Sequence, residues 1–243
     1  QEHPTLRLSM FRNVTFTAAN IANLLEGVAM ITALVQVPFF AYVTKDSTPI
    51  EGGLLVIRMT VMIPVGALAG GLLINRISHR VTAVTGFALA AIGLFLISRW
   101  QEDVTSAVQT RDLLIAGFGF GFNSPALAAA VVGSVSRARL AAGSAIHVVA
   151  KMTGEMIGMA ALSGWAIFIF EDSLDLEGMP VLQRQQTFSE MMERMQAIVE
   201  QRSMDAIMVV LHRFFIVAAL MCAIAIIPCL FIRVKAEAEE EVL

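Results

Sequence analysis

Long apolar stretches separated by short polar connections dominate the chain. A membrane-spanning helix needs about 20 mostly apolar residues, and six stretches approach or exceed that length. They are, in chain order, Asn13–Val43, Gly52–Asn75, Val81–Ser98, Leu113–Val135, Ala141–Phe170 and Ala206–Ile232. Polar turn residues interrupt the chain between them. The pattern predicts an all-α membrane protein, with a six-helix transmembrane bundle over residues 13–235.

The predicted bundle has three polar attachments. Residues 1–12 are expected to form a linker, and residues 236–243 an acidic tail. Residues 171–205 form a long loop in which apolar positions recur every three or four residues: Phe188, Met191, Met192, Met195, Ile198 and Val199. This spacing predicts an amphipathic helix. It could lie on the headgroups, cap the outer mouth or extend the sixth spanning helix, and we favour a helix packed on the outer surface.

Basic residues gather in alternate connections and set the predicted orientation. One side carries eight of them: Arg7, Arg12, Arg76, Arg80, Arg137, Arg139, Arg233 and Lys235. The short loops of the other side carry three: Lys45, Arg99 and Arg111. Short cytoplasmic loops are enriched in Lys and Arg. The linker, the tail and both termini are therefore expected in the cytoplasm, and the chain in the inner cell membrane as a multi-pass protein.

The composition removes several classes of protein. Hydrophobic residues make up 57 % of the chain and charged residues only 15 %, with a net charge of −3. Soluble domains are about a quarter charged, so this chain has too few polar residues to cover the surface of a soluble protein. It also lacks the excess of basic residues that is typical of a nucleic-acid binder. No zinc-spaced Cys/His set, catalytic triad or phosphate-binding glycine loop is visible. We expect no cofactor, no metal and no enzymatic activity.

The two cysteines are expected to be free thiols. Cys222 and Cys229 are seven positions apart in one apolar stretch. A helix rises about 10 Å over seven residues, which is too far for a disulfide. Burial as small apolar side chains is the expected role of both.

Polar residues inside the apolar stretches are the main functional candidates, because a charge at bilayer depth costs several kcal/mol. Glu26 lies near the middle of the first stretch and shares a helix face with Asn23. Asn20 precedes them, and Asn123 lies in the fourth stretch. A structurally paired acid is the simpler alternative for Glu26, but its mid-membrane position favours a functional role.

Charge is distributed unevenly among the six stretches. The third has no ionisable residue, and the sixth has none between Arg213 and Arg233, so these two can face lipid. The second carries Arg58. The fifth carries His147, Lys151 and Glu155 at four-residue steps, which predicts one polar stripe along a helix. Lys151 and Glu155 can pair within their own helix, as a structural fastening or as part of a relay.

Glycines four residues apart indicate where helices approach closely. The three pairs are Gly66 with Gly70, Gly117 with Gly121, and Gly154 with Gly158. This small-xxx-small spacing lets two helix backbones come together in a membrane.

One connection carries a recognisable signature. The turn after the second stretch reads Gly71-Leu-Leu-Ile-Asn75-Arg76-Ile-Ser78-His79-Arg80. It resembles the Gly-x-Leu-Ala-Asp-Arg-x-Gly-Arg-Arg loop of the major facilitator superfamily. The matching positions are Gly71, Leu73, Arg76 and Arg80, whereas Asn75, Ser78 and His79 depart from the signature. These departures imply a weaker conformational latch.

Two further segments strengthen the resemblance. Residues 3–16 look like the linker that enters the second half of the fourteen-helix drug:proton antiporters. Residues 117–125, with glycine at every second position up to Gly121, are similar to the glycine-rich helix of that same half. The resemblance extends over nearly the whole chain and implies a major-facilitator-type C-terminal bundle.

The resemblance assigns a place to each helix. It implies that the first and fourth helices line the cavity, the second and fifth face the other half, and the third and sixth face lipid. The residues expected in the transport pathway and in proton coupling are then Glu26, Asn20, Asn23 and Asn123. Those expected at the interface between halves are Arg58, His147, Lys151 and Glu155, and those of the cytoplasmic loop are Gly71, Asn75, Arg76 and Arg80. The two charge-free stretches coincide with the lipid-facing helices.

The implied function is that of a proton-coupled secondary transporter that exports an amphipathic compound or lipid. Alternating access needs two repeats around a midplane site. The expected partners are therefore a missing N-terminal half or a partner membrane subunit, together with the lipid bilayer, protons and a small amphipathic substrate. The alternative is a non-transporting six-helix scaffold subunit of a larger membrane complex. The presence of a single six-helix half favours this alternative. Glu26 disfavours it, because a scaffold gains nothing from an acid that is costly to bury in the membrane.

Overall fold

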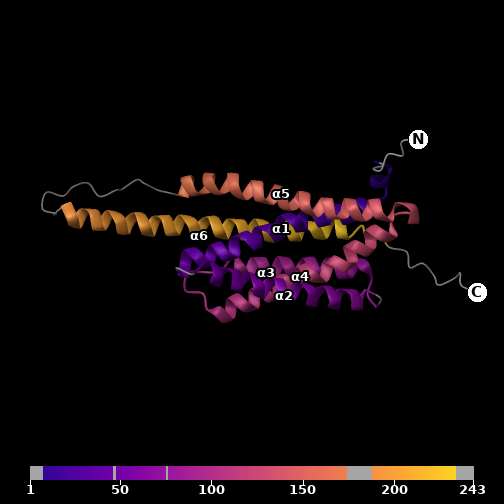
Figure 1. Ribbon diagram of the computed structural model, residues 1–243, viewed down its shortest axis with the longest axis horizontal. Coiled ribbons are helices and arrows are strands. Elements are labelled where there is room, and N and C mark those ends of the chain that lie inside the picture. The colour runs from indigo at the N-terminus through magenta and orange to yellow at the C-terminus, as the bar shows by residue number, and fades with distance from the viewer. Residues whose placement is uncertain (1–7, 46–47, 75, 174–187, 234–243) are drawn as a thin grey trace, which may run out of the picture.

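Six long helices account for most of the chain, and each matches a predicted stretch (Figure 1). The structure is a computed structural model that describes residues 8–45, 48–74, 76–173 and 188–233, with the backbone alone at 8, 9, 45, 49, 163, 166–173 and 188–203. The long helices are α1 (Val14–Lys45), α2 (Pro49–Leu73), α3 (His79–Ile97), α4 (Ser106–Gly133), α5 (Leu140–Ser173) and α6 (Phe188–Cys229). Two short 3₁₀ helices, η1 (Leu8–Arg12) and η2 (Arg137–Arg139), precede α1 and α5. The described residues contain no β-strand, which confirms the all-α fold.

Several expectations fall on residues outside this description. The structure does not describe most of the linker, Asn75 of the loop signature, residues 174–187 of the long loop, or the acidic tail.

The amphipathic segment forms part of a longer helix. α6 runs without a break for 42 residues from Phe188, so the predicted amphipathic helix is its first part. The prediction of a separate helix packed on the outer surface is therefore wrong. This segment instead extends the sixth spanning helix. Figure 1 shows this part of α6 running past the ends of α1 to α4. Helical periodicity cannot tell a separate helix from an extension, because the apolar spacing is the same in both.

The fourth helix begins seven residues before the predicted stretch, at Ser106 instead of Leu113. From the sequence, the residues up to Asp112 belong to the polar connection between the third and fourth stretches. Gln109 and Asp112 are instead buried, at 2 % and 0 % exposure. A helix can absorb polar residues when their side chains find partners inside the protein.

Capping residues fix where two of the helices begin. At the start of α2, the Thr48 hydroxyl accepts a hydrogen bond from the Glu51 backbone N–H, and the Glu51 carboxylate accepts one from the Thr48 N–H (2.8 Å). At the start of α3, the Ser78 hydroxyl accepts from the Val81 N–H (3.3 Å). Each cap satisfies backbone donors that have no partner within the helix.

The glycine pairs mark the closest helix contacts, as predicted. A methyl group on Gly117 would collide with the Met59 carbonyl of α2, and one on Gly121 with that of Ile63. Gly66 meets the carbonyl of Phe118 in the same way. α2 and α4 therefore pack backbone against backbone, as small-xxx-small helices do in membranes. In the view of Figure 1, α2 and α5 form the two opposite flanks of the bundle.

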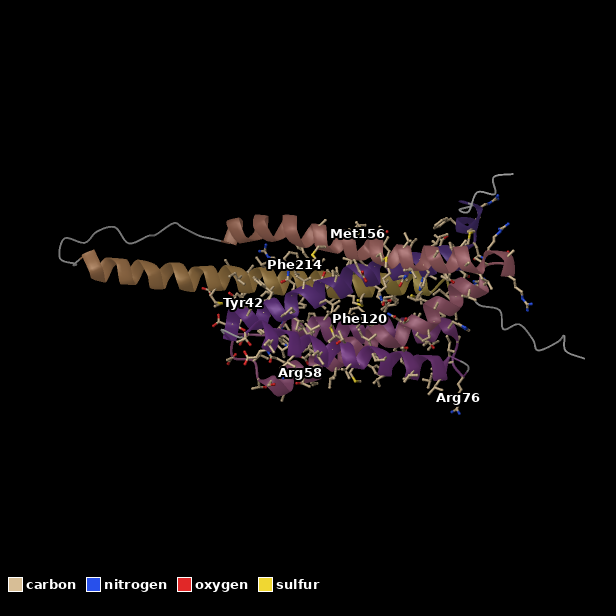
Figure 2. The ribbon with its side chains drawn as sticks, in the orientation of Figure 1. Tyr42, Arg58, Arg76, Phe120, Met156 and Phe214 are labelled. Atoms are coloured by element: carbon tan, nitrogen blue, oxygen red, sulfur yellow. The ribbon has the colours of Figure 1, made fainter. Side chains whose placement is uncertain are left out.

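One end of the bundle collects the termini of α1 and α6 together with two of the turns. Asn13 Nδ2 donates to the Ser134 carbonyl at the end of α4 (3.0 Å), and the Arg233 N–H donates to Thr15 Oγ1 (3.2 Å). Figure 2 places Arg76 at this end and Tyr42 toward the other. We call it the basic end, because it holds Arg12, Arg76, Arg80, Arg137, Arg139 and Arg233. The grouping of these residues was predicted from the sequence, and their cytoplasmic location stays a prediction.

Candidate functional site

A buried ion pair joins α1 to α5 deep in the bundle. The Glu26 carboxylate is 1 % exposed, and its Oε1 accepts a hydrogen bond from Lys151 Nζ at 3.0 Å. Glu26 lies twelve residues after the start of α1, which places it about 18 Å along the helix, near the middle of a bilayer. The Lys151 side chain is 30 % exposed. The carboxylate thus faces the interior, whereas the ammonium lies toward the bundle surface.

Close backbone packing between α1 and α5 brings this pair together. A methyl group on Gly27 would collide with the Lys151 carbonyl, and one on Gly154 with the Leu24 carbonyl. Gly27 directly follows the acid, and Gly154 lies one turn after the base. Because glycines at this contact bring the two backbones close together, the Lys151 side chain can reach the buried carboxylate of the neighbouring helix.

The predicted pairing of Lys151 with Glu155 within α5 is wrong. Lys151 bonds across to α1 instead, and Glu155 acts on Glu26 only through its charge. The physical reason is burial. An uncompensated carboxylate inside a bundle is far more costly than the half-buried one of Glu155, so the ammonium stabilises Glu26 more.

The three predicted asparagines have different partners, and the structure brings Asn123 to the Glu26 carboxyl. Asn23 Nδ2 donates to the His147 carbonyl of α5 at 2.6 Å. Asn20 Nδ2 donates to the Phe16 carbonyl of its own helix at 2.8 Å. Asn123 of α4 is fully buried and interacts with the Glu26 carboxyl, although neither of its amide atoms forms a hydrogen bond of good geometry. Side chains of α1, α4 and α5 therefore converge near one carboxyl group.

The four residues expected at the interface between halves do not form one cluster within the chain. His147, Lys151 and Glu155 lie along α5, whereas Arg58 lies on α2 at the opposite flank (Figure 2). The Arg58 guanidinium is tied to α4, where Nη1 donates to Ser106 Oγ at 3.0 Å and Thr110 Oγ1 at 2.8 Å.

The predicted loop signature lies at the basic end. Gly71 belongs to the last turn of α2, and a methyl group there would meet open space. Arg76 follows in the turn, its N–H bonded to the Leu73 carbonyl (2.8 Å), and Arg80 begins α3. Both arginines are exposed. They are available to a neighbouring protein or to lipid headgroups.

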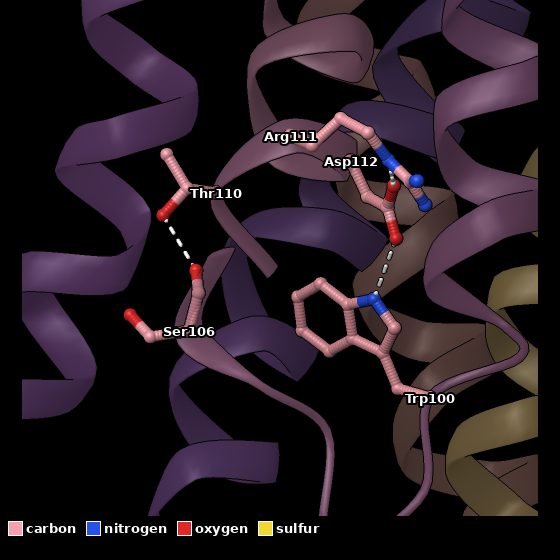
Figure 3. A network of polar contacts seen from close by, with 5 residues as sticks. All are labelled: Trp100, Ser106, Thr110, Arg111 and Asp112. Carbon is pink, nitrogen blue, oxygen red and sulfur yellow. Dashed lines mark hydrogen bonds and ion pairs between the residues drawn. The ribbon is translucent and has the colours of Figure 1, made fainter. Parts of the chain in front are cut away.

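A polar network at the opposite end was missed by the sequence analysis (Figure 3). Asp112 is buried and accepts two hydrogen bonds, from Trp100 Nε1 at 3.0 Å and from Arg111 Nε at 2.8 Å. His212 Nε2 of α6 donates to the Trp100 carbonyl at 2.6 Å. Trp100 therefore connects the α3–α4 connection with both α4 and α6. A tryptophan at the end of an apolar stretch, twelve residues before an aspartate, was the available signal.

No protein-family model matches the chain. A protein named triacylglyceride transporter from Mycobacteroides abscessus is 37 % identical over 170 residues, which are 66 % of this chain and 33 % of that protein. One of the same name from Mycolicibacterium smegmatis is 32 % identical over 236 residues, or 93 % of this chain and 42 % of that protein. A third triacylglyceride transporter, from Mycobacterium tuberculosis, is 32 % identical over 170 residues, which are 65 % of this chain and 33 % of that protein.

These similarities define a class. The names of the relatives are those of transporters, not of enzymes, and six helices here are long and apolar enough to cross a membrane. The chain is thus a multi-pass membrane protein related to lipid transporters. It spans between about a third and about two fifths of the length of the relatives it matches.

Proposed function

We propose that this chain is one six-helix half of a proton-coupled lipid transporter of the major-facilitator type, located in the inner membrane. It exports an amphipathic lipid by alternating access together with a second half. The names of the relatives support a lipid cargo, and their greater length leaves room for the second repeat that alternating access requires.

The Glu26–Lys151 pair carries the proposal. Ionised Glu26 holds the ammonium of α5, and proton binding removes the charge that attracts it. The protonation state of one carboxyl then biases whether α1 and α5 are tied together or free to separate. A two-state element whose balance depends on a bound proton is what coupling to a proton gradient requires.

The surroundings of the pair fit a largely apolar cargo. Apart from the ion pair, α1 and α4 contribute asparagines near Glu26, and the rest of the described interior is built mainly from Ala, Leu, Met and Phe. Sites for lipids and drug-sized ligands are lined by apolar side chains with a few placed polar groups. We propose an acylglycerol or a similar amphipathic lipid as the substrate.

The second half would dock on α2 and α5. These two helices are the least buried of the six, and both expose rows of apolar side chains, among them Ile57 and Val61 on α2 and Met152 and Met156 on α5. Arg58, His147, Lys151 and Glu155 are each only partly buried. We propose that the other half covers these polar groups, and that Gly71, Asn75, Arg76 and Arg80 form a cytoplasmic latch against it.

Transport of a fluorescent acylglycerol tests the proposal. The full transporter that contains this chain is reconstituted in vesicles, and uptake is driven by an imposed proton gradient. Glu26→Gln keeps the shape of the side chain but cannot exchange a proton, so gradient-driven transport is expected to fall at least about tenfold. Thr32→Val is the matched control, because the Thr32 hydroxyl is buried in the same helix and bonds only within it, to the Val28 carbonyl.

The outcomes separate the alternatives. If Glu26→Gln transports as the wild type does, the proton-coupling role is wrong. If the wild type moves no lipid under any gradient, the scaffold alternative is favoured.

A further inference from the structure

Four arginines of the basic end come from segments that are far apart in the sequence. η1 carries Arg12, η2 carries Arg137 and Arg139, and Arg233 follows the end of α6. All four are exposed. We call these four residues the arginine cluster.

η1 and η2 are held next to each other. Asn13, directly after η1, donates from Nδ2 to the carbonyl of Ser134, which lies just before η2 (3.0 Å). On the other side of η2, Gly143 in the first turn of α5 faces the buried Met10 side chain of η1, whose Cε would lie 3.7 Å from a methyl group on that glycine. The chain on both sides of η2 therefore contacts η1 or the residue that follows it.

The end of α6 is fixed to the same place. The Arg233 N–H donates to Thr15 Oγ1 at 3.2 Å, and the N–H of Thr15 donates to Asn13 Oδ1 at 2.9 Å. Figure 1 shows η1, the start of α5 and the end of α6 together at one end of the bundle. The fold thus gathers four positive charges from three parts of the chain on one surface.

These charges have no counter-charge within the described part of the chain. The segments that carry them contain no acid at residues 8–25, 113–154 or 206–233. The two ion pairs among the described residues lie elsewhere, between Arg111 and Asp112 and between Lys151 and Glu26. Like charges on one surface repel one another and attract an anion. The arginine cluster therefore fits a ligand with more than one negative charge.

Exposed apolar side chains lie beside the cluster. Phe11 precedes Arg12 and is 45 % exposed, and Val14 follows Asn13 and is 63 % exposed. Val132, two residues before the Ser134 carbonyl that binds Asn13, is 45 % exposed. A free anion makes no use of such side chains, whereas a lipid can place its acyl chains on them and its phosphates on the arginines.

We propose that the arginine cluster binds an anionic phospholipid with two phosphate groups in its headgroup, such as cardiolipin. Guanidinium groups bind phosphate oxygens through paired, charge-assisted hydrogen bonds, and four of them match two phosphates. Basic sites between transmembrane helices bind headgroups of this kind. This lipid is not the cargo, because acylglycerols carry no phosphate, and the proposal does not rest on the proposed function.

Native mass spectrometry counts the bound lipids and tests the proposal. The full-length protein that contains this chain is titrated in detergent with cardiolipin or phosphatidylcholine. The wild type is expected to bind cardiolipin at least about tenfold more tightly. Arg137→Gln combined with Arg139→Gln is expected to lower cardiolipin affinity at least about tenfold and to leave phosphatidylcholine binding unchanged. Both side chains are exposed, so this variant is expected to fold.

Arg76→Gln combined with Arg80→Gln is the matched control. It removes the same charge from the same end, but its α2–α3 turn lies apart from η1 and the start of α5 (Figure 1). Cardiolipin affinity is expected to stay within about twofold of the wild type. A second cluster variant, Arg12→Gln combined with Arg233→Gln, leaves η2 intact and is expected to lose affinity as the first one does.

Several results would overturn the proposal. Equal losses in the control and the cluster variants would show attraction by overall charge, and equal binding of both lipids by the wild type would show non-specific lipid only. Displacement of cardiolipin by excess inorganic phosphate would indicate a site for a free anion. Binding that appears only after removal of residues 236–243 would make the acidic tail the occupant. None of these measurements uses a gradient or a cargo, so each result leaves the proposed function standing.

Discussion

The Glu26 carboxyl is surrounded by residues far apart in the sequence. Lys151 neutralises it from α5, and Asn123 lies beside it from α4. Removing one partner of a buried ion pair leaves an uncompensated charge, which is strongly destabilising, whereas removing both is often tolerated. At the scale of single residues, the pair is therefore expected to behave as a unit.

Lys151→Met is expected to lower the stability of the bundle by up to about 3 kcal/mol, because Glu26 is then buried without a counter-charge. The double variant Glu26→Gln with Lys151→Met is expected to recover most of this loss. Thermal unfolding in detergent measures both. Glu155→Gln serves as control on the same helix, since the structure gives Glu155 no ion pair with Lys151. A larger loss of stability for Glu155→Gln than for Lys151→Met would support the pairing of Lys151 with Glu155 within α5.

The Trp100–Asp112 bond offers a second test at this scale. Trp100→Phe keeps an aromatic ring against Phe40 but removes the N–H that donates to the buried Asp112. A buried acceptor that loses a donor costs about 1–3 kcal/mol. We expect a loss in that range, read from the same thermal unfolding. An unchanged stability would mean that Arg111 alone satisfies the carboxylate.

At the scale of the helices, glycines decide how closely the elements pack. Gly117 and Gly121 of α4 lie against carbonyls of α2, and Gly27 and Gly154 do the same between α1 and α5. In a bilayer, where apolar burial hardly drives helix association, close van der Waals contact of this kind is a principal attraction.

Gly121→Ala is expected to destabilise the contact between α2 and α4 by about 1–3 kcal/mol, because the added methyl group runs into the Ile63 carbonyl. Gly53→Ala, in α2, is the control, since a methyl group there meets nothing within 4 Å. Alanine is a better helix former than glycine, so this control is expected to be neutral or slightly stabilising. Equal losses in the two variants, measured by thermal unfolding, would refute the close-contact explanation.

At the scale of the whole molecule, four helices make the core and two flank it. α2 and α5 carry partly exposed charges at bilayer depth along with rows of exposed apolar side chains. Charged residues within membrane spans normally face a protein interior or a water-filled cavity. This surface is the reason for our proposal that the other half of the transporter docks on α2 and α5.

Expressed alone in detergent, the chain is therefore expected to self-associate and not to elute as one stable monomer. Co-expression with the proposed N-terminal half is expected to give a single species. Size-exclusion chromatography with light scattering measures both. A well-folded lone monomer would argue against a partner on α2 and α5.

The sequence by itself determined the six membrane-spanning stretches, their order and most of their bounds, but not the early start of α4 or the extension of α6. These features depend on local quantities: the length of an apolar stretch, a capping residue such as Thr48 or Ser78, and a turn between them. It also identified Glu26 as a candidate, because an acid within a 32-residue apolar helix is unusual whatever surrounds it. The four-residue spacing of the three glycine pairs predicted close helix contacts, whereas the contact at Gly27 belongs to no such pair.

Only the tertiary structure decided which groups meet. A lysine reaches several positions from its own helix, and whether it bonds Glu155 or Glu26 depends on the rotation and depth of a neighbour fixed by Gly27 and Gly154. The early start of α4 likewise depends on Trp100, a partner for Asp112 that lies outside that helix. Pairings of this kind are set by the packing of whole helices, which no local pattern records.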